Sequence, residues 1–249
     1  MSLVFSAVIP NDPRIADELS SKGTHSQTFS AIQTVEGELY FMKPDTVILL
    51  TEYGGQIPEL ENTNIASTLD SACVKRKTFT TDVELATHMK TAVDNDVTDI
   101  PMTIIADQSI PSEISSPLTL LLNHLPDTKV IIISTGQLTD EQHKTFGTFL
   151  QHEINKSNKR IALIATGHLA IEKDHDRTFD STVMTSLRGN TPLDIEHIQP
   201  AIRLASKADV MAPLLILLST LATYTVTTEV VSYEQLYDAG QIVVEFQLR

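Results

Sequence analysis

Short apolar runs that lack an alternation of polar residues constrain the fold of this chain most strongly. They occupy residues 3–9, 46–50, 129–134 and 161–165. A strand that is buried on both faces is a continuous apolar run, and such strands form the interior of parallel sheets. Segments with helical spacing lie between these runs. The alternation of strands and helices therefore predicts a mostly parallel sheet with right-handed crossovers.

Capping patterns mark the starts of the helices between these strands. Residues 24–27, 81–84 and 139–142 each fit a capping box, in which a threonine lies three residues before a glutamine or glutamate. Apolar residues follow each box at helical spacing, which predicts three amphipathic helices that pack on the sheet. A further helix is predicted at residues 117–125 and a further strand at 102–106.

The residue pattern in the last third of the chain predicts two helices and a terminal hairpin. Residues 194–207 and 213–222 have a helical pattern, and the second segment is apolar enough to be buried. Residues 225–231 and 241–248 are rich in β-branched side chains and flank a turn at 237–240, which predicts a β-hairpin. We expect a single α/β domain over residues 1–249, with a mostly parallel central sheet, flanking helices and this C-terminal hairpin.

Composition and charge exclude several classes of function. The 249 residues include 32 Asp and Glu but 18 Lys and Arg, and the net charge of −14 is spread along the chain, so we expect no nucleic-acid partner. The longest apolar run, residues 213–222, is far shorter than the roughly 20 residues of a spanning helix, so no membrane segment is expected. Cys73 is the single cysteine, which predicts no internal disulfide and a cytoplasmic location.

Polar residues follow three of the four predicted strands directly. They are Asn11, Asp12, Glu52, Tyr53, Thr166, Gly167 and His168. Because open α/β sheets bind ligands beyond the carboxyl ends of their parallel strands, we expect these residues to line a pocket. Pro10 and Pro13 fix a sharp turn that frees the side chains of Asn11 and Asp12 from secondary structure. An imidazole at a strand end favours His168 as the candidate catalytic residue, and a polar residue that satisfies loop backbone groups is the alternative.

Several landmarks follow one another in a particular order along the chain. A first strand ends in a Pro-x-x-Pro turn, and the strand ends TEYGG, SSPLTLLL, KVIIISTG and RIALIATGHL follow. The segments ADVMAPLLILLSTLA and VVSYEQLYDAGQIVVEF complete the series. Over nearly its whole length the chain therefore resembles the class III extradiol ring-cleavage dioxygenase superfamily, of the beta-subunit type that includes the Memo-like proteins. The resemblance implies a homo-oligomer or a complex with a second subunit.

Members of that superfamily hold Fe(II) with two histidines and one carboxylate, and open coordination positions admit a catechol and dioxygen. The resemblance places the first histidine at Asn11, and the second at Tyr53, or at Glu52 with a shift of one residue. It places the carboxylate at Asp209, four residues before Pro213. One ligand of three is therefore retained.

The resemblance also implies that the catalytic base has changed. The family histidine falls on Ile171, whereas His168 stands three residues earlier, where the family has an aspartate. A further family histidine falls on Ser112, ahead of a Ser-Pro-Leu segment at 116–118. Ser112 therefore joins the residues expected at the pocket.

Two classes of function remain open. The first is a degenerate, non-catalytic member of the superfamily that binds a small aromatic or other small molecule, or acts as a subunit or interaction module. The second is a metal-dependent oxidoreductase, an aromatic-diol dioxygenase in which Asp209 binds Fe(II) or Mn(II) with His168 and Glu52. Loss of both ligand histidines favours the first class, because neither asparagine nor un-ionised tyrosine donates to Fe(II) as imidazole does.

Other polar residues have a structural explanation at least as good as a functional one. The basic cluster at 75–77 fits a solvated turn, with anion binding as the alternative, and Cys73 fits a small buried side chain, with a reactive thiol as the alternative. His175 fits an ion pair in a charged loop, and His143 and His152 are expected on the polar side of their helix. No nucleotide-binding or serine-hydrolase motif occurs in the sequence.

Overall fold

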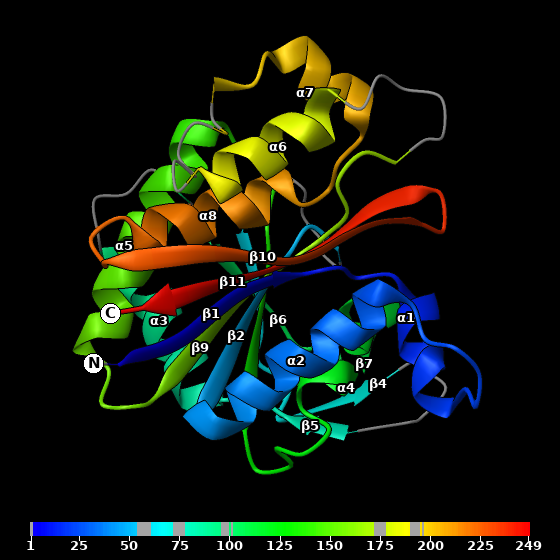
Figure 1. Cartoon of the computed structure of the whole chain (residues 1–249). Coiled ribbons are helices and arrows are strands. Elements are labelled where there is room, and N and C mark those ends of the chain that lie inside the picture. The colour runs from blue at the N-terminus through cyan, green and yellow to red at the C-terminus, as the bar shows by residue number, and fades with distance from the viewer. Residues whose placement is uncertain are drawn as a thin grey trace.

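Four parallel strands form the centre of the main sheet. The computed structural model describes residues 2–53, 61–71, 78–95, 100, 102–171, 178–189, 195 and 197–249. Within this part, the central strands lie side by side in the order β1 (Leu3–Ile9), β9 (Ile161–Thr166), β2 (Thr46–Thr51) and β8 (Lys129–Ser134) (Figure 1). Nearly all of their residues are buried, which confirms the prediction from the apolar runs.

Further strands extend this sheet on both sides. β11 (Ala239–Leu248) pairs antiparallel with β1, and β10 (Val226–Leu236) pairs antiparallel with β11, so the predicted C-terminal hairpin is confirmed. On the other side, β3 (Glu61–Asn64) pairs antiparallel with β8, and β6 (Met102–Ile105) pairs parallel with β3. A small second sheet, which we did not predict, consists of β5 (Thr78–Thr80), β4 (Thr68–Ser71) and β7 (Ser109–Ile110).

Helices cover both faces of the main sheet and enclose two apolar layers. One layer is formed with α1 (Pro13–Asp17), α2 (Gln27–Met42) and α4 (Ser112–Leu121), and a short 3-10 helix, Glu18–Ser20, follows α1. The other layer is formed with α3 (Val83–Asn95), α5 (Asp140–Lys156), α6 (Thr178–Arg188), α7 (Pro200–Ser206) and α8 (Met211–Leu221) (Figure 1). This is the predicted α/β architecture. Among the described helices, none is long and apolar enough to cross a bilayer.

One of the three predicted helix starts is confirmed and two are wrong. The capping box at 139–142 forms at the start of α5. Ser26, and not Thr24, caps α2, because the Glu18 carboxylate accepts hydrogen bonds from the N–H and the hydroxyl of Ser26 and fixes it there. Asp82, one residue after the predicted cap, accepts a hydrogen bond of 3.3 Å from the N–H of Leu85 in the first turn of α3. At both helices a carboxylate, from Glu18 or Asp82, stabilises a first turn that begins later than predicted.

Two other helices differ in extent from the prediction. α4 begins at Ser112, five residues before the predicted start, and Pro117 lies inside it. Proline is favoured at a helix start, which is why the sequence indicated a start there. α7 begins at Pro200, after Gln199 with a non-helical ψ of 133°, so the predicted start at residue 194 was six residues too early. Cys73, the basic cluster at 75–77 and His175 lie outside the described residues.

Candidate functional site

Two strand ends and the segment before α8 meet at the carboxyl edge of the parallel strands. Asn11 follows β1, His168 follows β9, and Asp209 lies two residues before α8. Asn11 Nδ2 donates to Asp209 Oδ2 at 3.2 Å, and His168 Nδ1 lies 3.3 Å from the same oxygen. The backbone N–H of His168 donates to Asp209 Oδ1. The structure thus brings together three of the residues that we expected at one pocket.

Gly167 allows the end of β9 to lie against the segment before α8. Its φ is +156°, and a Cβ at this position would lie 2.5 Å from Val210 Cα and 2.8 Å from Asp209 Oδ1. A larger residue would therefore displace backbone. Thr166, the last residue of β9, is buried and donates its hydroxyl to the Leu50 carbonyl at 3.1 Å. Gly167 therefore permits the close approach of the two segments, and Thr166 binds the end of β9 to β2.

Asp12 is not free of secondary structure, so this prediction was wrong. Its Oδ1 accepts hydrogen bonds from Arg14 N and Nε, both at 2.9 Å, and its Oδ2 accepts one from Arg14 Nη2 at 2.6 Å. The carboxylate therefore caps α1 and also lies 3.8 Å from His168 Nε2. Arg14, which we did not single out from the sequence, lies 4.3 Å from the centre of the Tyr237 ring. Proline after an aspartate was the available signal for this cap.

His168 lies between two carboxylates, and this placement controls its charge. Burial disfavours the charged imidazole, but contacts with Asp12 and Asp209 outweigh it and raise the pKa of His168 to about 9. Burial would also raise the pKa of Asp12, but the contacts with His168 and Arg14 hold that pKa well below its ordinary value. At neutral pH the imidazole is therefore protonated and paired. In this state it donates hydrogen bonds, whereas a general base requires the neutral imidazole.

Glu52 and Tyr53 follow β2 at the same edge, near Asp209. Partial burial and the charge of Asp209 raise the pKa of Glu52 to about 7 and that of Tyr53 to about 12. The phenol of Tyr53 therefore stays un-ionised. Glu113 adds to the shift at Tyr53 and accepts a hydrogen bond from the Ser112 hydroxyl at 3.0 Å, which places the start of α4 beside this site.

These residues do not fit the iron centre that the resemblance implied. An amide and a phenol stand at the two histidine positions, Asn11 and Tyr53, and neither donates to Fe(II) as imidazole does. Both oxygens of Asp209 already accept hydrogen bonds from Asn11 and His168. In the described part of the chain, no group of three or more His, Cys, Asp and Glu side chains is arranged to hold a metal ion.

Two further buried polar residues lie near this edge. His143 was expected on the polar side of α5 but is buried, 3.2 Å from the Gly136 carbonyl oxygen and 3.7 Å from Glu61 Oε1. Burial raises the pKa of Glu61 to about 8 and lowers that of His143. Sequence reasoning missed this pair, because Glu61 lies in a short polar strand that shows no apolar pattern. His152 is exposed, as predicted.

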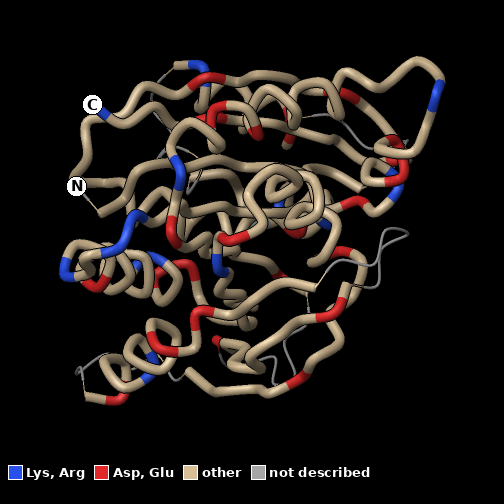
Figure 2. Tube along the Cα trace, turned by 90° about the horizontal axis from the view of Figure 1, so that it is seen from below, with Lys and Arg blue, Asp and Glu red and all other residues tan. Residues whose placement is uncertain are grey.

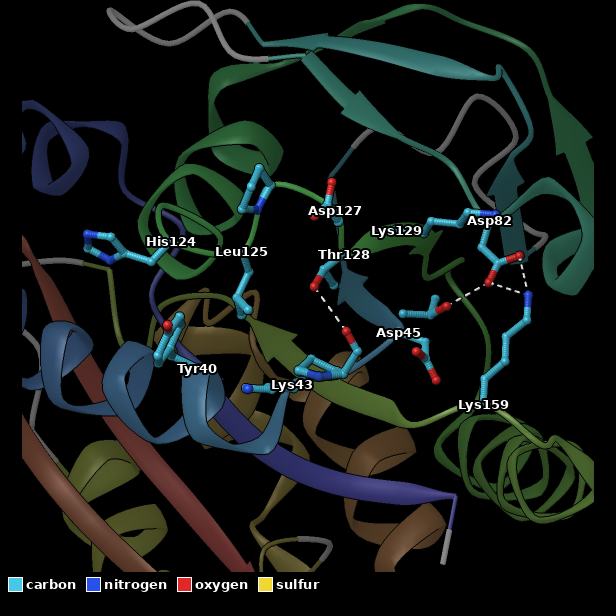
Figure 3. A pocket seen from close by; sticks show the side chains of 13 residues that line it. Tyr40, Lys43, Asp45, Asp82, His124, Leu125, Asp127, Thr128, Lys129 and Lys159 are labelled. Carbon is cyan, nitrogen blue, oxygen red and sulfur yellow. Dashed lines mark hydrogen bonds and ion pairs between the residues drawn. The ribbon is translucent and has the colours of Figure 1, made fainter.

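A separate hollow of about 510 Å³ lies at the opposite end of the parallel strands (Figure 3). Here the two oxygens of the buried Asp82 carboxylate each accept a hydrogen bond from Lys159 Nζ at 2.7 Å, and one accepts Thr46 Oγ1 at 2.6 Å. These bonds join the start of α3 to the sheet. Because the buried charges are already paired, this hollow has a structural explanation, and the carboxyl edge remains the candidate site.

The fold and the site define an α/β protein whose candidate site lies where the ends of β1, β2 and β9 meet the start of α8. A family model described as the catalytic LigB subunit of aromatic ring-opening dioxygenase matches residues 10–244. The chain belongs to this family, which confirms the relationship to class III extradiol dioxygenases.

Among solved structures, the chain is similar to an uncharacterized protein of Escherichia coli K12, JW3007. The TM-score is 0.72 at 12% sequence identity, over 98% of this chain and 100% of the other. At this identity the likeness supports the fold alone. No curated protein matches the sequence.

Proposed function

We propose that this chain is a non-catalytic member of the LigB family that binds a small molecule at the carboxyl edge of its sheet. The observation that supports this most is the state of Asp209. The retained family carboxylate is bonded to the Asn11 amide and to protonated His168, so its donor atoms are engaged by the protein itself. The cytoplasm is the location we propose.

One observation favours a second candidate, a metal-dependent oxidoreductase. The carboxyl group of Glu52 has a pKa near 7, in part because of the charge on Asp209. A divalent cation bound between Glu52, His168 and Asp209 would relieve this repulsion, and such a donor set suits Fe(II) or Mn(II). Binding would require His168 to lose its proton and Asp209 to leave its present hydrogen bonds.

Metal binding separates these two candidates. Purification without chelators, metal analysis and anaerobic titration with Fe(II) and Mn(II) should give no stoichiometric metal for the wild-type chain. A ring-cleavage assay with catechol should give no turnover in the same samples, although catechol binds. Stoichiometric metal that is lost in Asp209→Asn or His168→Gln would contradict the proposal and support the oxidoreductase.

A gain of function tests whether the site is a former iron centre. We expect the double variant Asn11→His, Tyr53→His to bind Fe(II) or Mn(II), because it restores two imidazoles beside Asp209. The matched control is Asn11→Gln, Tyr53→Phe, which changes the same positions without adding a metal ligand. Equal metal binding by both variants would mean that the three positions do not form one centre.

A further inference from the structure

A groove of about 370 Å³ lies between α2 and the β1, β10 and β11 side of the sheet. Thr34, Glu38 and Met42 form the helix wall, and their spacing of four residues places them on one face of α2. The opposite wall includes Phe5 near the start of β1 and Val231 in β10. The groove is therefore at the other end of β1 from the candidate site and forms a separate feature.

Three glutamates in this groove repel one another. Glu229 of β10 and Glu245 of β11 are direct cross-strand partners, and like charges in such a pair destabilise a sheet. Burial, together with the charges of Glu38 and Glu229, raises the pKa of Glu245. No Lys or Arg lines the groove, and among the described residues none of the three glutamates forms an ion pair. Gln247 Nε2 donates a hydrogen bond to Glu229 Oε2 at 2.9 Å, so Glu229 has a neutral partner. No cation among the described residues neutralises the three carboxylates.

Exposed apolar side chains lie beside the acidic groove. Tyr40, Phe41 and Met42, at the end of α2, are 44%, 75% and 38% exposed. Met42 lines the groove, whereas Tyr40 lines the hollow at the amino ends of the strands (Figure 3). The other large apolar side chains that are exposed in the described part of the chain, Ile104 and Leu204, lie outside this cluster. Acidic residues occur along most of the described trace (Figure 2), so the apolar cluster is what distinguishes this surface. Contiguous apolar patches of this kind mark interaction sites.

We propose that this groove binds a basic segment of a partner protein that carries apolar side chains on one face. Lys or Arg residues of such a segment would neutralise the cross-strand pair Glu229 and Glu245, and its apolar face would cover Phe41 and Met42. A second copy of this chain fits less well, because its net charge of −14 adds repulsion. A metal ion fits less well too, since the described acidic residues form no group that could hold one.

A defined peptide tests the proposal directly. The probe is a synthetic amphipathic helix of leucine and lysine, and the control peptide has glutamate in place of every lysine. Isothermal titration with the full chain should show binding of the lysine peptide, and the affinity should fall as salt is added. The glutamate peptide should not bind. Equal binding of both peptides would overturn the charge argument.

Matched variants locate the binding surface. Glu38→Gln with Glu245→Gln should weaken binding of the lysine peptide by roughly tenfold, the effect of two lost charge pairs of about 0.7 kcal/mol each. The control Glu84→Gln with Glu141→Gln removes two exposed charges from α3 and α5 and should change the affinity by less than about twofold. Equal weakening in both would mean non-specific attraction and would overturn the proposal.

Two further measurements separate misfolding and self-association from loss of binding. Glu245→Gln relieves a repulsion, so its free energy of unfolding should equal or exceed that of the wild type. Phe41→Ser should weaken peptide binding and leave the sedimentation coefficient of the chain unchanged. A wild-type dimer that Phe41→Ser dissociates would show that a second copy covers the groove, and the proposal would then be wrong.

Discussion

The two ends of the parallel strands each hold a buried aspartate, and they differ in how completely the polar groups around it are satisfied. At the amino end, Asp82 is bonded to Lys159, Thr46 and the N–H of Leu85. At the carboxyl end, around Asp209, several buried polar atoms accept or donate no hydrogen bond within the described residues. They are Asn11 Oδ1, both oxygens of Glu61, Thr135 Oγ1 and His143 Nδ1.

This difference concerns hydrogen bonding inside the protein. Buried polar atoms are normally paired, and unpaired ones need a ligand, a water or a functional reason. At the amino end Asp82 fastens α3 to the sheet, and Thr81 Oγ1 is the buried polar atom there without a hydrogen-bond partner among the described residues. At the carboxyl end more such atoms gather, which agrees with our proposal that a small molecule binds there.

The largest effect is expected from Gly167→Ala at the carboxyl end. The new Cβ would lie 2.5 Å from Val210 Cα, so the end of β9 or the segment before α8 must move. We expect a loss of about 3 to 4 kcal/mol in the free energy of unfolding, measured by urea denaturation.

The control for this substitution is Gly37→Ala in α2, where a Cβ meets no atom within 4 Å. It should stabilise the chain by about 0.5 to 1 kcal/mol, because alanine has a higher helix propensity than glycine. A Gly167→Ala variant as stable as the wild type would show that the two elements do not need this close approach.

Lys159→Met should have the next largest effect, at the amino end. The substitution keeps the length of the side chain but leaves the Asp82 carboxylate buried without its cation. Breaking such a pair should reduce the free energy of unfolding by about 2 to 3 kcal/mol. Lys90→Met, which removes an exposed pair with Asp94 on α3, should cost less than about 0.5 kcal/mol. Equal losses in the two variants would remove the contrast between a pair with a buried carboxylate and a surface pair.

The smallest effect should come from Glu61→Gln and should depend on pH. The pKa of Glu61 rises from its ordinary 4.5 to about 8 in the folded chain, because burial disfavours the charged form. The folded state therefore binds this proton more tightly, so the contribution of Glu61 to stability is fully present below pH 4.5 and is lost as the pH rises to about 8. At about pH 6, roughly 1.5 units above the ordinary pKa, Glu61→Gln should be more stable than the wild type by about 2 kcal/mol.

Denaturation at several pH values between 4.5 and about 8 measures the difference in the free energy of unfolding between Glu61→Gln and the wild type. Asp82 behaves in the opposite way: burial would raise its pKa, but bonds with Lys159 and Thr46 lower it, so its contribution is lost only in acid. Of these two groups, only Glu61 should therefore lose its contribution to the free energy of unfolding as the pH rises. A constant difference between Glu61→Gln and the wild type across the range would mean that Glu61 does not titrate.

The central strands could be predicted from the sequence to within one residue, because a strand buried on both faces must be apolar along its length. β3 was missed for the opposite reason. Its four residues, Glu61–Asn64, are all polar and all buried, so they contain no apolar pattern to detect. The start of α2 was missed because Glu18, eight residues before Ser26, fixes Ser26 as the cap. At α3, two adjacent residues could both act as the cap, and the structure uses Asp82.

The meeting of Asn11 and His168 could be expected, because parallel strands bring their carboxyl ends to one edge, and the family resemblance added Asp209. The pairing of Asp12 with Arg14 and the burial of His143 against Glu61 could not. These contacts depend on which side chains face one another after the layers have packed. The same packing places Asp12 near His168, and this contact helps to raise the pKa of His168.

The position of β11 has a consequence for synthesis on the ribosome. β11 lies between β1 and β10, so β1 gains its antiparallel neighbour only after residues 239–248 have been translated. By then Asn11, His168 and Asp209 have all emerged. A nascent chain can therefore contain every residue of the site while one side of its first strand still presents open backbone N–H and C=O groups. Translation arrest ahead of β11 should leave the nascent chain dependent on chaperones.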